Sequence, residues 1–231
     1  MIEGVVMLEK AARTALAGRW RVGLLAVGVL ALWAGRLEAQ GLAVEVRGGM
    51  IASSALVEDA VVAPELEGEL GLGGRVEGVR VGPGVAPLVE VAARTGFGRD
   101  LAFEVAAGWA PAELGGSEAG RRWRAGEVDV GHAVFRLRRG VLGRYHVRGG
   151  LGVIRYSGGR AGLLRAGPVM KPVLEVGGGA EWQVGEPRVS VGVLAQAHRF
   201  GSGVVEEVGG REGVVWRVGV QLGLAFGRGV R

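Results

Sequence analysis

The feature that most restricts how this chain can fold is an alternating stretch near its C-terminus, Val214 to Phe226, which reads VVWRVGVQLGLAF. Alternate positions carry large apolar side chains, and the positions between them carry polar or small ones. A helix repeats every 3.6 residues and cannot sort side chains in this way, whereas a strand places successive side chains on opposite faces. At about 3.3 Å per residue, the stretch is long enough to cross a bilayer as a tilted strand.

Seven further stretches repeat this alternation, so the sequence predicts eight strands and an all-β fold. These seven further strands are Leu42–Ile51, Ala86–Gly96, Leu101–Ala110, Gly126–Arg138, Gly143–Arg155, Pro172–Val184 and Arg188–Phe200. The third of them is expected to end at Pro111, since proline cannot donate to a sheet ladder. In the fourth, Val128 and Val130 lie on one parity and Phe135 on the other, which predicts a bulge near Gly131 and His132.

The connections between these strands alternate in length. Residues 97–100, 139–142 and 185–187 form short turns, whereas four connections are long. Outer-membrane barrels place long loops outside the cell and short turns on the periplasmic side. With the first strand starting in the periplasm, every long connection falls outside, and the first of them is long enough to form a hairpin of its own. The long connections are 52–85, 111–125, 157–171 and 201–213.

The N-terminal residues have the composition of a targeting segment. Basic residues precede the apolar run from Val22 to Ala34, and a small residue, Ala39, follows a short polar stretch. These are the three parts of a cleaved secretory signal peptide, so residues 1–39 are predicted to be removed and 40–231 to form the barrel domain. Met7 is an alternative start. The competing interpretation is a single inner-membrane anchor, for which the apolar run is short.

Composition excludes several classes of protein. The chain has no cysteine, which rules out disulfides and cysteine-ligated metal sites, and no motif indicates a cofactor or a metal. A sequence pI of about 10.5 is common in nucleic-acid binders. Here, however, basic and acidic residues are interspersed, and no long basic run occurs, so we expect no nucleic-acid partner. The 46 glycines suit the bends and close backbone contacts of a small curved barrel.

Alternation alone does not say which face of the strands points outward. A soluble, secreted barrel that binds an apolar ligand would have the same period with its apolar face turned inward. The apolar parity is rich in Val and Leu along nearly all strands, which suits lipid, and only helices and closed barrels satisfy their backbone groups in a bilayer. The sequence favours the membrane barrel, and the soluble barrel stays as the alternative.

The last strand also carries a family signal. Arg217, Gly219, Leu222 and Leu224, followed by the aromatic Phe226, resemble the closing-strand motif of bacterial outer-membrane barrels, which the barrel-assembly machinery reads. The whole of 40–231 is similar to the small eight-stranded barrels of the OmpA transmembrane domain, OmpX and OmpW types. The GRGVR tail departs from this pattern, because the aromatic is usually the final residue. The resemblance implies an eight-stranded antiparallel up-and-down transmembrane β-barrel in the outer membrane, expected to be a monomer with outer-membrane lipid around it.

The resemblance and the alternation together assign roles to two sets of side chains. If the apolar parity faces lipid, the other parity fills a narrow lumen, where buried charges must be paired. We therefore predict an interlocking network of Glu45, Arg47, Glu90, Arg94, Glu104, Arg144, Arg148, Glu175, Glu181 and Arg217. Aromatic residues near strand ends are predicted to form the interfacial girdles: Phe97, Trp109, Phe135, Tyr145, Trp182, Trp216 and Phe226.

These features predict a structural or surface role, or limited passage of small solutes, rather than catalysis. One enzymatic alternative deserves a test, because some small outer-membrane barrels modify lipid A. His198 is followed by Ser202, Glu206 and Glu207, but the spacing differs from the His-x-Ser pair of the deacylase family. A nucleophile also needs its base within hydrogen-bond reach. The sequence therefore predicts a protein that is not an enzyme.

Overall fold

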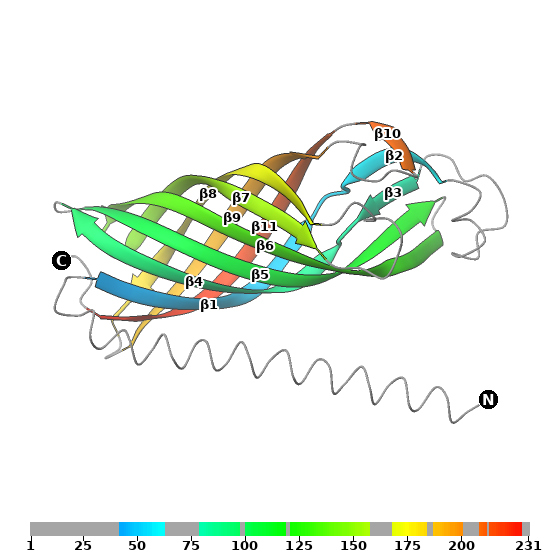
Figure 1. Cartoon of the computed structure of the whole chain (residues 1–231). Coiled ribbons are helices and arrows are strands. Elements are labelled where there is room, and N and C mark those ends of the chain that lie inside the picture. The colour runs from blue at the N-terminus through cyan, green and yellow to red at the C-terminus, as the bar shows by residue number, and fades with distance from the viewer. Residues whose placement is uncertain are drawn as a thin grey trace, which may run out of the picture.

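A computed structural model describes residues 42–62, 79–97, 100–118, 121–157, 168–183, 187–200, 208–211 and 213–227. The predicted signal peptide, residues 1–39, and the end of the GRGVR tail lie outside the described residues. In the part of the chain that is described, no helix is long and apolar enough to cross a membrane. The described elements are strands, and they form one continuous antiparallel sheet (Figure 1).

Eight of these strands close into a barrel. Each pairs with the strand that follows it around the wall, and β1 pairs with β11 from Val44 opposite Phe226 to Ser53 opposite Arg217. This last pairing leaves the barrel wall without an edge strand. The fold class predicted from the alternation, an eight-stranded antiparallel up-and-down barrel, is confirmed. The eight strands are β1 (Leu42–Ser53), β4 (Val85–Phe97), β5 (Leu101–Glu118), β6 (Arg121–Leu142), β7 (Tyr145–Ser157), β8 (Val169–Trp182), β9 (Arg188–Phe200) and β11 (Gly213–Phe226).

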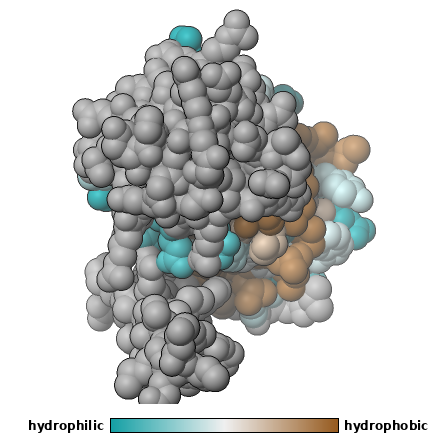
Figure 2. Space-filling model, turned by 90° about the vertical axis from the view of Figure 1, so that its right-hand side faces the viewer, coloured by the Kyte–Doolittle hydropathy of each residue, from teal (hydrophilic) through white to brown (hydrophobic). Residues whose placement is uncertain are grey.

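The apolar face of the strands points outward. Along β11, every second residue from Val214 to Leu224 is 45–64% exposed, while the residues between them are buried. Those ten residue steps, tilted by about 40°, span about 25 Å, which is the height of the apolar band on a membrane barrel. Figure 2 shows apolar side chains on the part of the wall visible from that side. The soluble barrel with an apolar interior face is therefore wrong for this chain.

Three short strands extend the barrel at the end opposite the short turns: β2 (Val57–Val62), β3 (Val79–Gly82) and β10 (Val208–Arg211) (Figure 1). β10 pairs with β2, β2 with β3, and β3 with Gly115–Ser117 of β5. We call this β10–β2–β3 sheet, with the paired ends of β5 and β6, the outer extension. It includes the hairpin expected within residues 52–85.

Two predictions about β5 and β6 were wrong. Pro111 does not end its strand, because β4 stops pairing with β5 at Trp109 and β3 begins only at Gly115. On the side of β5 where β4 and β3 lie, an N–H at position 111 would have no ladder partner, so a proline costs little there. Consequently 111–125 is mostly strand rather than loop.

The bulge expected near Gly131 and His132 is also absent from the described ladders. The pairing of β5 with β6 runs without a shift from Leu101 to Leu114, and that of β6 with β7 runs without one from Asp129 to Gly140. Val128, Val130 and His132 all point into the barrel. The apparent change of parity arises because apolar residues fill part of the interior.

Candidate functional site in the barrel interior

The middle of the barrel holds a compact cluster of charged side chains. Arg136 of β6 lies at its centre, and its side chain is 0% exposed, as are those of Glu90 on β4 and Glu104 on β5. Arg47 of β1 and Glu175 of β8 complete the cluster. Five different strands thus contribute one residue each, so the cluster exists only once the barrel has closed.

The two guanidiniums of this cluster bind three carboxylates. Arg136 Nη2 donates to Glu90 Oε2 at 2.6 Å and to Glu175 Oε2 at 2.9 Å, and Nη1 donates to Glu104 Oε1 at 2.8 Å. Arg47 Nη1 donates to Glu90 Oε1 at 2.7 Å, and its Nη2 donates to Glu104 Oε2 at 2.7 Å. Buried charges are tolerated when paired and hydrogen-bonded in this way, and removing one partner leaves a costly uncompensated charge.

Neutral side chains extend the cluster toward the neighbouring strands. Gln196 Nε2 donates to Glu175 Oε2 at 2.9 Å, and Gln196 Oε1 accepts from Arg217 Nη1 at 2.9 Å. Arg148 Nη2 donates to Gln221 Oε1 at 2.6 Å. Glu45 accepts from Arg47 Nη2 and from the Ser190 hydroxyl. Amides and a hydroxyl therefore supply part of the hydrogen bonding at the edge of the cluster, where Arg148 Nε and Gln221 Nε2 make no hydrogen bond.

Glycines on the inward parity make room for these long side chains. A Cβ atom at Gly108 would lie 2.3 Å from His132 Cε1, and one at Gly223 would lie 2.7 Å from Glu45 Oε1. The same is true of Gly150 beneath Arg136, where the distance to Cγ would be 2.9 Å. Gly108 and Gly223 thus leave volume for the polar network, whereas at Gly49 and Gly152 a Cβ would first meet a backbone oxygen of the neighbouring strand.

Toward the outer extension the interior becomes apolar. A layer of buried aliphatic side chains lies between the charged cluster and the outer end of the barrel, and Tyr156 and His198 lie beside it, with 2.8 Å between Tyr156 Oη and His198 Nε2. The sequence did not lead us to expect this layer. Its members include Ile51, Leu88, Ala110, Val128, Val130, Ile154 and Val215.

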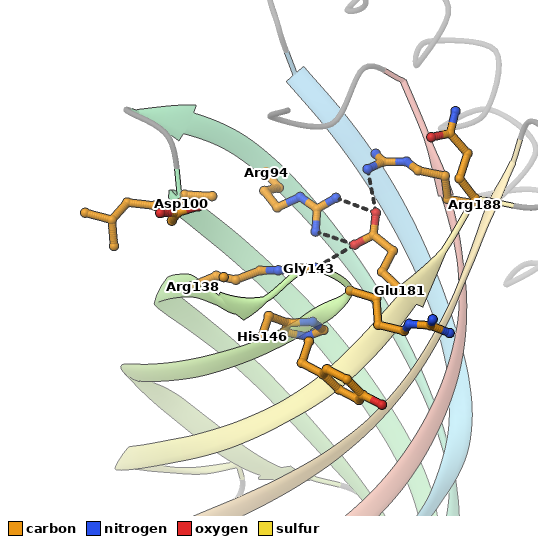
Figure 3. Close-up of a pocket in the computed structure, with 13 residues that line it drawn as sticks. Arg94, Asp100, Arg138, Gly143, His146, Glu181 and Arg188 are labelled. Atoms are coloured by element: carbon orange, nitrogen blue, oxygen red, sulfur yellow. Dashed lines mark hydrogen bonds and ion pairs between the residues drawn. The ribbon is translucent and has the colours of Figure 1, made fainter.

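At the opposite end, where the short turns lie, the interior opens into a cavity of about 340 Å³. Arg94, Arg138 and Arg188, from three strands, converge on the carboxylate of Glu181 (Figure 3). Arg94 Nη1 lies 3.1 Å from Glu181 Oε2, and Arg138 and Arg188 approach to 2.5 Å. We call this space the inner mouth. His146 also lines it.

Glu90, His132 and Glu175 place potential metal-ligand atoms within 4.8 Å of one another. Arg136, however, donates to both carboxylates, and His132 Nε2 lies 2.9 Å from Glu90 Oε2. The positive charge that a metal would supply is thus already provided by a guanidinium. The geometry fits an ion-pair network better than a metal centre.

The structure places nine of the ten residues of the predicted lumen network on the interior side of the wall. Arg144 differs, because it lies exposed in the β6–β7 turn and lines only the rim of the inner mouth. Sequence reasoning missed Arg136 and Arg138, the most connected residues of β6. The predicted bulge assigned Val128 and Val130, which precede it, to the wrong face, but it left Phe135 and Leu137 correctly outward. Arg136 and Arg138 alternate with these two residues, so parity alone could have identified both as inward.

The aromatic residues predicted as girdles lie on the outward face, either near the strand ends or on the part of the wall closer to the short turns. Phe97 stacks on Phe103 with 4.3 Å between ring centroids, and Phe103 lies 5.4 Å from Phe135. Trp109 Nε1 donates to Asp129 Oδ1 at 3.2 Å. Asp129 lies where the outward face of β6 becomes polar toward the outer extension. Tyr145 and Trp216 are exposed, and Trp182 and Phe226 are half-buried.

His198, the one described residue of the enzymatic alternative, does not face lipid. His198 points into the barrel and contacts Tyr156, whereas a lipid substrate would lie outside the wall. Ser202, Glu206 and Glu207 lie outside the described residues. The geometry that a hydrolytic site needs, a nucleophile beside an oriented base, is therefore not formed by the described side chains.

No family model matches the chain, and no curated protein matches it either. Among solved structures, it is similar to OprG from Pseudomonas aeruginosa, at 12% identity and a TM-score of 0.44, over 80% of this chain and 96% of that one. Neisserial surface protein A gives 13% identity and a TM-score of 0.47, over 81% and 97%. Ail from Yersinia pestis gives 13% and 0.38, over 80% and 99%.

The assignment of the chain rests on its own geometry rather than on these similarities. It is a closed antiparallel barrel with an even number of strands, an apolar exterior band and a charged interior. Those properties define the transmembrane β-barrels of the bacterial outer membrane. The outer membrane is therefore the location of this protein.

Proposed function

We propose that this protein is a monomeric, non-enzymatic outer-membrane barrel with a sealed lumen, whose role is to hold the outer extension at the cell surface. The observation that carries the proposal is the fully buried centre of the barrel. The side chains of Arg136, Glu90 and Glu104 are 0% exposed, so they are closed to solvent from both ends. A solute would have to displace buried, paired charges to pass.

The apolar layer above the cluster supports the same conclusion. Ions crossing the barrel would meet aliphatic side chains such as Val130 and Ile154 immediately after the charged cluster. An apolar constriction opposes ion passage because it dehydrates the ion. The inner mouth is thus the open end of a space that the network closes.

The outer extension supports a surface role. β5 and β6 have 18 and 22 residues, more than the 9–11 or so that a tilted strand needs to cross the hydrocarbon core. Their outer ends and the β10–β2–β3 sheet therefore project beyond the membrane. Recognition surfaces are commonly carried on such projections from a rigid scaffold.

Conductance in a planar lipid bilayer tests the sealed lumen. We expect the refolded barrel to produce no discrete conductance steps under conditions in which an open general porin produces them. Heat-modifiable migration on a gel confirms that the sample is folded. Reproducible single-channel steps from folded protein would contradict the proposal and favour limited passage of small solutes instead.

Labelling of single cysteines tests which end faces the cell exterior. The natural chain has no cysteine, so each introduced thiol is unique. Ser54→Cys lies between β1 and β2 near the outer extension, and Arg144→Cys lies in the β6–β7 turn; both positions are exposed. A membrane-impermeant maleimide should label Ser54→Cys on intact cells and Arg144→Cys only after lysis. The reverse pattern would invert the barrel and place the extension in the periplasm.

The assembly part of the proposal rests on β11, and the enzymatic alternative has a test of its own. The closing motif lies on β11, with Gly219 facing Ile51 of β1, which suits a strand that the assembly machinery pairs last. Mass spectrometry of lipid A from cells with and without the protein should show no difference. A new or missing acyl chain on lipid A would establish the enzymatic alternative.

A further inference from the structure

The inner mouth has more positive than negative charge. Three guanidiniums, those of Arg94, Arg138 and Arg188, share the single carboxylate of Glu181. In the central cluster, by contrast, two guanidiniums share three carboxylates. Arg144 and Asp100 add one charge of each sign to the lining of the cavity. The space therefore has an excess of two positive charges among its described lining residues.

Two buried nitrogen atoms at this cavity have no hydrogen-bond partner. Arg138 is 9% exposed, and its Nη1 makes no hydrogen bond; its nearest ion-pair contact is Glu45 Oε2, 3.8 Å away. His146 is 6% exposed, and its Nδ1 is also without a partner. Buried donors are normally satisfied, so Arg138 Nη1 lacks an acceptor in this part of the cavity.

The arrangement of the donors favours an oxyanion. The guanidiniums come from β4, β6 and β9, line the cavity and converge on Glu181 (Figure 3). Guanidinium groups present planar forks of N–H donors that match phosphate oxygens. The cavity, of about 340 Å³, has room for several groups the size of a water molecule, each of which takes about 30 Å³. It is therefore larger than a phosphate group, and waters or the atoms bonded to that phosphate would fill the remaining volume.

We propose that the inner mouth binds a phosphate group, with Arg138 Nη1 as the principal donor and Arg94 and Arg188 as supporting cations. Two sources offer this chemistry at the periplasmic face: dissolved phosphate, and the headgroup of a phospholipid from the inner leaflet. Either one would supply the acceptor that the buried Arg138 nitrogen lacks. It would also offset the excess positive charge around Glu181.

Isothermal titration of the folded, full-length barrel in a phosphate-free, non-ionic detergent tests the site. Inorganic phosphate and a soluble short-chain phosphatidylglycerol are titrated in separate arms. At least one should bind at one site per barrel. Arg138→Gln should weaken that binding about tenfold or more, because a charge-assisted hydrogen bond to a buried oxyanion is lost. Arg188→Gln, at a less buried position, should weaken it as well.

Arg139→Gln is the matched control. Arg139 is the next residue on β6, but it points outward and is exposed, so its removal should leave binding unchanged. Heat-modifiable migration shows that each variant is folded. Tighter binding of phosphate than of the lipid identifies a solute site, and the converse identifies a headgroup site. Absence of binding in both arms, or equal binding by wild type, Arg138→Gln and Arg188→Gln, would overturn the proposal.

Discussion

Replacing Arg136 by methionine tests whether the charged cluster stabilises the barrel. The substitution removes hydrogen bonds from one guanidinium to three carboxylates and keeps most of the side-chain volume. Glu90 and Glu104 retain their bonds to Arg47. Glu175 loses its closest cation and keeps only Gln196 at 2.9 Å and Arg148 at 4.0 Å. An uncompensated buried carboxylate of this kind costs about 3–5 kcal/mol in the free energy of unfolding.

The measurement is a urea titration of the barrel in lipid vesicles, followed by tryptophan fluorescence. If Glu175 causes most of the loss, Arg136→Met combined with Glu175→Gln should recover about 1 kcal/mol or more of the stability lost in the single variant. Arg139→Met, on the outward face of the same strand, should change little. A stability of Arg136→Met within about 1 kcal/mol of wild type would refute the reasoning, because the cluster would then not depend on its central cation.

Three further outcomes follow from the same structure. Val220→Arg, on the lipid face of β11, should destabilise the barrel by about 2–4 kcal/mol in vesicles, whereas Val214→Arg near the strand end should cost about 1 kcal/mol or less. Gly108→Ala should lower the free energy of unfolding by about 1–3 kcal/mol, since the new methyl group displaces His132 from Glu90. Raising NaCl to about 1 M should leave the stability contribution of Arg136 nearly unchanged, because buried pairs are poorly screened. Urea titrations of each variant against wild type check all three.

The sequence by itself determined the strands and divided each of them into an apolar face and a face of polar or small residues. Alternation in Val214–Phe226 and its seven counterparts predicts a barrel because a period of two is a local property of the chain. The long Val- and Leu-rich parity favoured an apolar exterior because it suits lipid, but only the exposure of that face in the structure excluded the soluble barrel. The inward position of residues such as Arg47, Glu90 and Glu175 then follows from parity alone.

Only the tertiary structure decided what those side chains contact. Arg136 reaches Glu90, Glu104 and Glu175, which lie 46, 32 and 39 residues away, and sequence spacing does not encode which strands face one another across the lumen. Pro111 and Val128 illustrate the same limit. A proline is tolerated where a neighbouring strand has ended, and a valine can fill the interior where the barrel is apolar. Both depend on the closure of the sheet, which brings distant strands together and is not visible in any one of them.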